Sequence, residues 1–420
     1  MIGVGRDGPL GVVTASAPTE SSSGRQGLSE REALAVLATV DGVGPVTLAR
    51  LIDRLDGAVR VLAAARERDA VPLLVDASRD PDGPGHGIAA KVAARVVDAA
   101  TRAETILRGL ERANVRIVTL EDDVYPARLR AIELPPHVLF VRGDPAALGR
   151  RRAVAVVGTR RPSEAGRRVA ARIATGLVRA DASVVSGLAI GIDGAAHAAV
   201  VAEHGITVAV LGGGHDHLFP PGHRRLADAI VDAGGAVISE LPPDKEPTPG
   251  SFPRRNRVIS GLSEATVVVE AGARSGALLT ACWALEQGRE CFLVPGPIDS
   301  PMSAGCLGFL REFAGQARIV SGVPQLLEDL GLADLPDPLD GAALEPPVAA
   351  VLLELGEGVR RVAAALLHDR TTADELVAST GLPIAAVLGA LTLLEARDLV
   401  AGAYGRYRPA GRLAAVMTIP

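Results

Sequence analysis

The chain has 420 residues, of which 48% are hydrophobic and 22% charged. At about 150 residues per domain, this length predicts two or three modules. The formal net charge of −5 excludes a uniformly basic surface, so any nucleic-acid site must be local. Lysine occurs only at Lys91 and Lys245, and almost every positive charge is therefore an arginine. Arginine suits bidentate phosphate contacts, although a GC-rich genome produces the same bias.

Cysteine content and apolar runs favour a cytoplasmic protein. Cys282, Cys291 and Cys306 follow no metal-ligand spacing, and an odd number of thiols argues against a disulfide framework. Charges interrupt every apolar run before the about 18 residues that a membrane helix needs. We therefore expect no membrane association.

The first part of the chain predicts a tail followed by a helical domain. Residues 1–27 are rich in Gly, Ser and Thr, and we expect them to be disordered. Residues 28–110 are expected to form a helical domain of the helix-hairpin-helix or SAM-like type, with Ser29 as a cap. The turn at 40–46, VDGVGPV, could present backbone amides to a DNA phosphate, or it could simply join two helices.

Residues 111–322 predict an α/β core with an extended Rossmann-like parallel sheet. Continuous aliphatic strands alternate with helices, which is typical of a sheet covered on both faces. Residues 323–346 are expected to be a linker, with some local helix at 324–332. Residues 347–410 predict a winged-helix-like domain, in which 372–380 and 383–395 form the helix-turn-helix and 399–408 the hairpin.

Ligands of an open parallel sheet bind beyond the carboxyl ends of the strands. The loop at 156–163, VVGTRRPS, places Arg160 beside a helix start, which is a natural anion site. In the loop at 186–197, SGLAIGIDGAAH, glycines allow close approach to the backbone, and Asp193 is expected to cap the helix that carries His197. Neither loop spells a dinucleotide fingerprint or a nucleotide-hydrolase phosphate loop.

Two further loops carry polar side chains. The segment 211–219, LGGGHDHLF, suggests a metal site at His215 and His217. These two histidines alternate along the chain and do not share one helical face, and no other cluster of ligands completes a site. We therefore expect no metal and no cofactor. The segment 251–261, SFPRRNRVISG, is interpreted as a loop in which Phe252 lies beside three arginines and an amide. That combination stacks a base and neutralises phosphates. The alternative is that Phe252 packs on the sheet and one arginine pairs with Glu240.

With these motifs the sequence resembles the DNA-processing protein A family, also called Smf. Two positions depart from the family pattern: Arg274 replaces a more usual lysine, and Leu307 replaces a more usual asparagine, whose hydrogen bonds it cannot make. The resemblance rests on motifs in consistent order: Tyr125-Pro126, Pro135-Pro136, Arg142-Gly143-Asp144, Gly158-Thr159-Arg160, 186–193, Ala196-His197, Leu211-Gly212, Ser239-Glu240, 252–257, Arg274-Ser275-Gly276, Thr280-Ala281 and Pro295-Gly296.

The resemblance implies a single-stranded-DNA-binding protein rather than an enzyme. It further implies a homodimer that protects incoming DNA and loads the RecA recombinase during natural transformation. Arg160 would contact phosphate, the backbone of Ser186 and Gly187 would form the pocket floor, and Phe252, Arg254 and Arg257 would line the path of the strand. The expected DNA-binding residues are Arg160, Ser186, Gly187, Gly213, Phe252, Arg254, Asn256, Arg257, Arg274 and Ser275. We expect Arg160→Ala and Arg257→Ala each to weaken binding without altering the melting temperature by more than a few degrees.

Two other functions compete with this interpretation. A nucleotide-processing enzyme related to phosphoribohydrolases could use the same fold, with Glu240 and Glu270 as carboxylates at strand ends, but the Pro-Gly-Gly-x-Gly-Thr loop of those enzymes is missing from the sequence. A double-stranded-DNA regulator could use the winged helix. Its expected recognition helix, 383–395, has no arginine or lysine, so packing or protein contact is favoured there.

Overall fold

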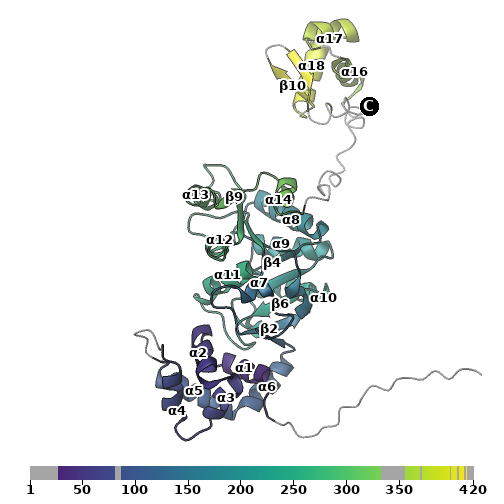
Figure 1. Ribbon diagram of the computed structural model, residues 1–420. Coiled ribbons are helices and arrows are strands. Elements are labelled where there is room, and N and C mark those ends of the chain that lie inside the picture. Colours follow the sequence, from purple (N-terminus) through teal and green to yellow (C-terminus); the bar gives the residue numbers. More distant parts are fainter. Residues whose placement is uncertain are drawn as a thin grey trace, which may run out of the picture. The chain divides into compact units, whose positions relative to one another are not determined.

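The computed structural model describes residues 27–80, 87–332, 355–368, 371–397, 399–403, 406–410 and 413. The chain divides into two compact units, Met1–Pro336 and Asp337–Pro420, which are treated separately below. The predicted disordered tail lies almost wholly outside the described residues. Figure 1 shows the elements of each unit.

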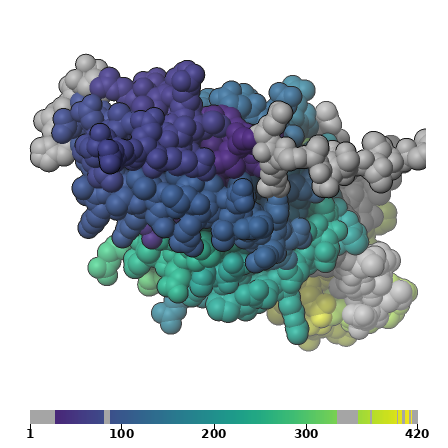
Figure 2. All heavy atoms as spheres, turned by 90° about the horizontal axis from the view of Figure 1, so that it is seen from below, coloured from purple at the N-terminus to yellow at the C-terminus, as the bar shows by residue number. Residues whose placement is uncertain are grey.

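A helical domain opens the first unit. Ser29 caps the first helix in a capping box with Glu32, which confirms the cap expected from the sequence. The helices bury aliphatic side chains against one another and against Val138 and Phe140 of the neighbouring sheet. In Figure 2 the purple and blue spheres of this domain lie directly against the teal and green spheres of the core. The helices are α1 (Glu30–Ala38), α2 (Pro45–Leu55), α3 (Ala58–Ala64), α4 (Ala70–Ala77), α5 (Ala90–Thr101) and α6 (Ala103–Arg112).

The core contains a nine-stranded sheet with the order β1-β2-β6-β5-β4-β3-β7-β8-β9. Strand β2 runs antiparallel to both of its neighbours, and the other pairings are parallel. The chain reverses its direction of travel across the sheet between β3 and β7, which is where such folds bind ligands. The strands are β1 (Arg116–Thr119), β2 (Val138–Gly143), β3 (Ala153–Val157), β4 (Ser183–Ser186), β5 (Thr207–Val210), β6 (Ala236–Ser239), β7 (Ala265–Val268), β8 (Glu290–Leu293) and β9 (Ala317–Ile319).

Helices cover both faces of the sheet because alternate strand residues point to opposite sides. In β3, Val154 and Val156 pack under α8, α9 and α14, whereas Ala153, Ala155 and Val157 face the layer that contains α11 and α12. The core helices are α7 (Ala127–Arg130), α8 (Glu164–Arg179), α9 (Ile192–Ala202), α10 (Arg224–Asp232), α11 (Ser251–Gly261), α12 (Gly276–Glu286), α13 (Ala304–Glu312) and α14 (Val323–Asp329). The predicted Rossmann-like α/β core is thereby confirmed.

One strand and one boundary differ from expectation. Strand β9 was not predicted, because it has three residues and two of them are exposed. The segment assigned to a linker from residue 323 begins with α14, whose Val323, Leu326 and Leu327 are buried against α8 and the sheet. Residues 323–332 therefore belong to the core, and the rest of the expected linker lies outside the described residues.

The second unit has the predicted winged-helix order. It contains α16 (Glu357–Leu366), α17 (Ala373–Thr380), α18 (Ile384–Glu395) and the hairpin β10 (Val400–Ala403) and β11 (Arg406–Pro409). Thr372 caps α17 in a capping box, as its position before Glu375 allows. Within the described ranges no individual helix is both long and apolar enough to cross a membrane; α17 and α18 reach that level only as a pair bent by 113°.

Candidate functional site

The segment with the most unusual composition, 251–261, is a helix and not the loop that we expected. Helix α11 buries Val258 and Ile259 against the sheet, and this apolar pair anchors an otherwise polar segment. Residues four apart share a helix face, so Phe252 and Asn256 point to the same side. The helical period therefore separates side chains that the sequence interpretation had grouped into one binding loop.

A cavity of about 830 Å³ opens at the carboxyl ends of the strands, beside α11. We call it the Phe252 cavity. Its lining combines two aromatic rings, two arginines and several hydroxyl or amide groups, which is a composition that can hold a base and a phosphate together. It is lined by Val157, Gly158, Arg160, Ala189, Asp193, Phe219, Pro247, Thr248, Pro249, Phe252, Pro253, Arg255, Asn256, Ile259, Ser275, Gly276, Ala277, Leu279 and Thr280.

Arg160 and the aromatic rings form one wall of this cavity. The guanidinium carbon of Arg160 lies 5.3 Å from the ring centroid of Phe252, within cation–π range. Phe219 meets Phe252 edge to face, with ring centroids 6.0 Å apart. Phe219 is 51% exposed, which is unusual for a large apolar ring and leaves it available to a ligand.

Two buried side chains of opposite charge, Asp193 and Arg255, hold the floor of the cavity by binding the backbone of Gly187. The amide of Gly187 donates to Oδ2 of Asp193 at 3.0 Å, and the carbonyl of Gly187 accepts from Nη1 of Arg255 at 2.8 Å. A β-carbon on Gly187 would lie 2.6 Å from Nη2 of Arg255, so this position requires glycine. Burial lowers the pKa of Arg255 to about 10, and the nearby Asp193 carboxylate opposes that shift. Arg255 therefore stays charged at neutral pH.

The structure changes three expectations about residues in or near this floor. Asp193 lies inside α9 and does not cap it: it binds the Gly187 amide, while Gly191 occupies the cap position. Ser186 is fully buried and donates to the carbonyl of Val156 at 2.6 Å, so it supports the floor from beneath. Gly213, expected among the DNA-binding residues, is buried with Pro247 packed against it and does not line the Phe252 cavity.

The expectation that Arg257 contacts DNA is corrected by the structure, because its side chain is buried and already paired. Its side chain is 5% exposed and forms an ion pair with Glu240, whose side chain is 15% exposed. Burial raises the pKa of Glu240, and the charge of Arg257 opposes this shift. The alternative considered from the sequence, that one arginine of α11 pairs with Glu240, is thereby confirmed for Arg257.

The remaining predicted residues divide between the Phe252 cavity and other places. Asn256 lines the cavity and donates to the carbonyl of Gly276 at 3.2 Å, and Ser275 lines it as the cap of α12. Arg274 is exposed in an adjacent hollow with Thr159 and Met302. Leu307 is half-buried in α13, outside the lining of the Phe252 cavity.

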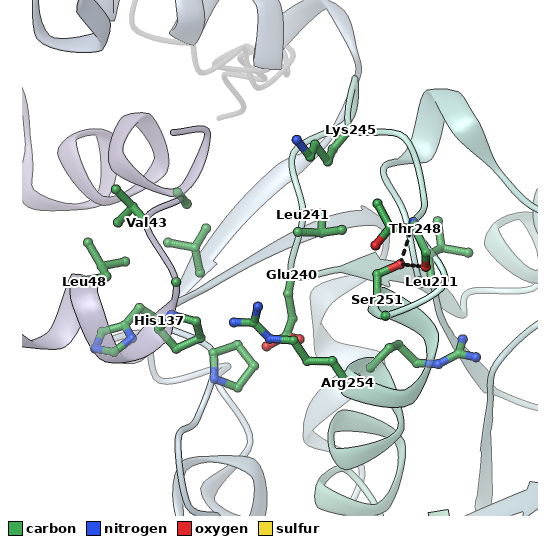
Figure 3. Close-up of a pocket in the computed structure, with 18 of the residues that line it drawn as sticks. Val43, Leu48, His137, Leu211, Glu240, Leu241, Lys245, Thr248, Ser251 and Arg254 are labelled. Carbon is green, nitrogen blue, oxygen red and sulfur yellow. Dashed lines mark hydrogen bonds between the residues drawn. The ribbon is translucent and has the colours of Figure 1, made fainter. Parts of the chain in front are cut away.

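Arg254 lies on the other side of α11. Figure 3 shows it extending from α11 toward Glu240, on the side that Val43 and Leu48 of the helical domain occupy. It therefore does not line the Phe252 cavity.

The anion site expected at the start of α8 is already filled by a carboxylate. Glu270, just beyond β7, accepts from the amide of Ser163 at 2.8 Å and from its hydroxyl at 2.5 Å. A β-carbon on Gly166 would lie 2.4 Å from a Glu270 oxygen, so the helix start fits closely around this side chain. The position at which Rossmann folds bind a nucleotide phosphate is thus closed here.

The histidines of the third loop do not gather into a metal site. His215 is buried, and its Nε2 lies 3.0 Å from the carbonyl oxygen of Val237. Within the described residues, no group of three or more His, Cys, Asp or Glu side chains could hold a metal ion.

Two residues of the cavity were missed from the sequence. Arg255 was not singled out from the sequence, although a buried arginine needs backbone carbonyls or a carboxylate to compensate its charge. It donates to the carbonyls of Gly187 and Val210, and the nearby Asp193 carboxylate favours its charged form. Phe219 is distant in sequence from Phe252, and only the tertiary fold brings the two rings together.

Comparison with known proteins places this geometry in a family. Residues 116–331 match the family model described as DNA recombination-mediator protein A, and 345–405 match a DprA winged helix domain. The chain belongs to the DNA-processing protein A family. The matched core contains the whole Phe252 cavity, so the cavity belongs to the part of the chain that defines the family.

Relatives of the DNA-processing protein A family cover most of the chain. The DprA protein of Mycobacterium tuberculosis is 40% identical over 321 residues, 73% of this chain and 80% of the relative. Protein Smf of Escherichia coli K12 is 38% identical over 306 residues, 72% of this chain and 80% of the relative. The crystal structure of DprA from Streptococcus pneumoniae covers 72% of this chain and 99% of its own, with 28% identity and a TM-score of 0.58. Membership thus confirms the predicted family and α/β fold class.

Proposed function

We propose that this protein binds single-stranded DNA in the Phe252 cavity. The observation that carries the proposal is the contact between Arg160 and Phe252, which puts a guanidinium and an aromatic face on one wall. A base can stack on the ring while the arginine neutralises a phosphate beside it. Membership in a family named for DNA processing and recombination mediation supports the same assignment.

The shape of the cavity favours a single strand over a duplex. Bases paired inside a double helix present only their edges in the grooves, whereas Phe252 and Phe219 offer ring faces and edges within a recessed cavity. A strand whose bases are unstacked can place one base against these rings. The winged helix is a weaker candidate for a DNA-binding site, since α18 has no basic residue.

The contacts of the nearby carboxylates support a binding role in place of catalysis. Glu240 is paired with Arg257, and Glu270 is held by Ser163 at the start of α8. Neither side chain is therefore free to act on a ribose as a general acid or base without breaking a structural contact. The phosphoribohydrolase-like alternative finds no favourable observation in this geometry.

The wider role is part of the same proposal. We place the protein in the cytoplasm as a homodimer that protects incoming single strands and loads the RecA recombinase onto them during natural transformation. Family membership supports this role, as does a site that would hold DNA by one strand while leaving most of its bases free for pairing. A strand-exchange assay with RecA would test it, because loading requires faster exchange in the presence of this protein.

A titration tests the binding step itself. The full chain is added to fluorescent oligo-dT, or to a matched duplex, at two salt concentrations. We expect preference for the single strand and an affinity that falls as salt rises, because phosphate contacts release counterions. Equal affinity for duplex, or binding insensitive to salt, contradicts the proposal.

A further inference from the structure

We propose that the strand continues from the Phe252 cavity into a second cavity, formed between the helical domain and α11, where Arg254 binds a phosphate. This inference rests on the proposed single-stranded-DNA-binding function and extends it. The second cavity has a volume of about 260 Å³, and we call it the interdomain cavity. It would make the N-terminal helical domain part of the DNA site.

The interdomain cavity has walls of different character. Val43, Pro45 and Leu48 of the helical domain supply an apolar wall, and Thr248, Ser251 and Arg254 supply a polar one from the core. Figure 3 shows Val43 and Leu48 on one side and Ser251 and Arg254 on the other, with Glu240 between them. An apolar wall opposite hydroxyl and guanidinium groups suits a nucleotide, which has an apolar base face and a charged phosphate.

The two cavities adjoin each other across α11. Thr248 and Arg255 line both of them. Residues two apart in an α-helix lie on nearly opposite sides, so Phe252 and Asn256 point into the first cavity and Arg254 into the second. A strand held on Phe252 can therefore reach Arg254 by passing over the start of α11.

Two arginines, Arg254 and Arg257, interact with the one buried carboxylate of Glu240, so one of the two positive charges is not neutralised. Glu240 is already in contact with Arg257, and Lys245 is in contact with Asp41 of the helical domain. The exposed Glu246 also lines the cavity, but among the described residues no carboxylate is in ion-pair contact with Arg254. The phosphate of a bound strand would supply the missing negative charge.

The helical domain faces Arg254 with a second positive feature. Helix α2 begins with Pro45 after Gly44, and no side chain caps it. A β-carbon on Gly44 would lie 3.6 Å from Nη2 of Arg254, so the guanidinium and the helix start approach each other closely. A guanidinium and the positive end of a helix dipole repel, and an anion bound between them relieves that repulsion.

Substitution at Gly44 tests the proposal by supplying the anion from the protein itself. Gly44 has φ −90° and ψ 175°, which any residue can adopt and which suits an N-cap aspartate. Gly44→Asp would cap α2 and pair with Arg254, and so block the phosphate while leaving folding intact. Gly44→Asn is the matched control, because it caps the helix without adding charge. Arg254→Ala removes the anchor directly, with the exposed Arg60→Ala as its control.

The measurement is the affinity of each full-length variant for oligo-dT of about 4, 8 and 12 nucleotides. The shortest oligonucleotide should occupy the Phe252 cavity alone, and we expect all variants to bind it equally. For the longer ones, Gly44→Asp and Arg254→Ala should lose about tenfold in affinity relative to the unaltered protein. Gly44→Asn and Arg60→Ala should not.

Three outcomes overturn the inference. If both Gly44→Asp and Arg254→Ala bind the longer oligonucleotides as tightly as the unaltered protein does, no phosphate binds at Arg254. An equal loss in Gly44→Asp and Gly44→Asn assigns the effect to the shape of the turn. An equal loss at every length places Arg254 in the first site. Failure of the unaltered protein to bind any oligonucleotide contradicts the proposed function itself, which is a distinguishable result.

Discussion

The guanidinium carbon of Arg160 lies 5.3 Å from the centroid of the Phe252 ring. The two residues come from different elements, since Arg160 follows β3 and Phe252 lies in the first turn of α11. Their contact joins the switch point of the sheet to the helix that lines the cavity. It also brings the two kinds of interaction that hold a single strand, charge and stacking, to one place.

Arg160→Ala should weaken binding mainly through electrostatics. Arg160 is exposed and has no ion-pair partner among the described residues, so its removal should leave the melting temperature nearly unchanged. The slope of log affinity against log salt should become shallower by about 0.7, the value for one phosphate contact to a single strand. Oligo-dT titrations at several salt concentrations measure this slope. An unaltered slope, or the same change in Arg172→Ala on the exposed face of α8, would remove Arg160 from the site.

Phe252→Ala should lower the affinity for oligo-dT without changing its salt dependence, in contrast to Arg160→Ala. Loss of a stacking ring costs about 1–3 kcal/mol per base, which corresponds to a loss of about 5- to 150-fold in affinity. The salt slope should stay the same because no charge is removed. Phe252→Tyr is the control and should retain most of the affinity, since it keeps the aromatic face. A Phe252→Ala protein that binds oligo-dT normally would contradict stacking at this ring.

Arg257→Ala should destabilise the fold, contrary to the expectation from sequence. The substitution leaves Glu240 buried without its partner, and breaking such a pair costs about 3–5 kcal/mol. The effect is measured by chemical denaturation of the variant. Arg257→Ala combined with Glu240→Ala should recover part of the loss, because the unpaired charge disappears. A free energy of unfolding equal to that of the unaltered protein would show that the pair contributes little.

Glu270→Ala should expose the anion site that the carboxylate now fills. Removal of the contacts to Ser163 should cost about 1 kcal/mol, as for other helix caps. Inorganic phosphate should then raise the melting temperature of Glu270→Ala and not that of the unaltered protein, because the freed amides of α8 can bind it. Thermal unfolding with and without phosphate checks this expectation. Equal stabilisation of both proteins would mean that Glu270 does not close the site.

Acidification should destabilise the protein through His197. Burial lowers the pKa of His197 to about 3, well below its usual value. Between these two pKa values the unfolded chain binds a proton that the folded chain does not, so stability falls as pH falls. Each pH unit below about 6.5 should remove about 1.4 kcal/mol. The free energy of unfolding, measured from pH 7.5 to 5, should show a shallower dependence in His197→Gln, and an equal dependence would contradict the assignment.

Local signals in the sequence predicted the elements of the core, but tertiary contacts decided the site. Continuous aliphatic runs such as 153–157 and 236–239 are strands, as their composition predicts, and their side chains are buried on both faces. Helix α11 was misread as a loop, since three arginines and a proline hide the apolar pair Val258 and Ile259 that anchors it.

Long-range pairing explains the remaining differences. The sequence named Glu240 as the partner of one arginine in 251–261 but did not say which; it is Arg257, 17 positions away. The antiparallel direction of β2 depends on how β1 and the helical domain pack against it, which no residue within β2 specifies. The meeting of Phe219 with Phe252 is of the same kind.

Photocrosslinking tests the central claim most directly. Full-length protein is irradiated with oligo-dT that carries 5-bromodeoxyuridine, and the attached peptides are identified by mass spectrometry. We expect crosslinks in α11 at Phe252 and in the loop that contains Phe219. Crosslinks confined to the winged-helix unit, with none at the carboxyl ends of the strands, would contradict DNA binding in the Phe252 cavity.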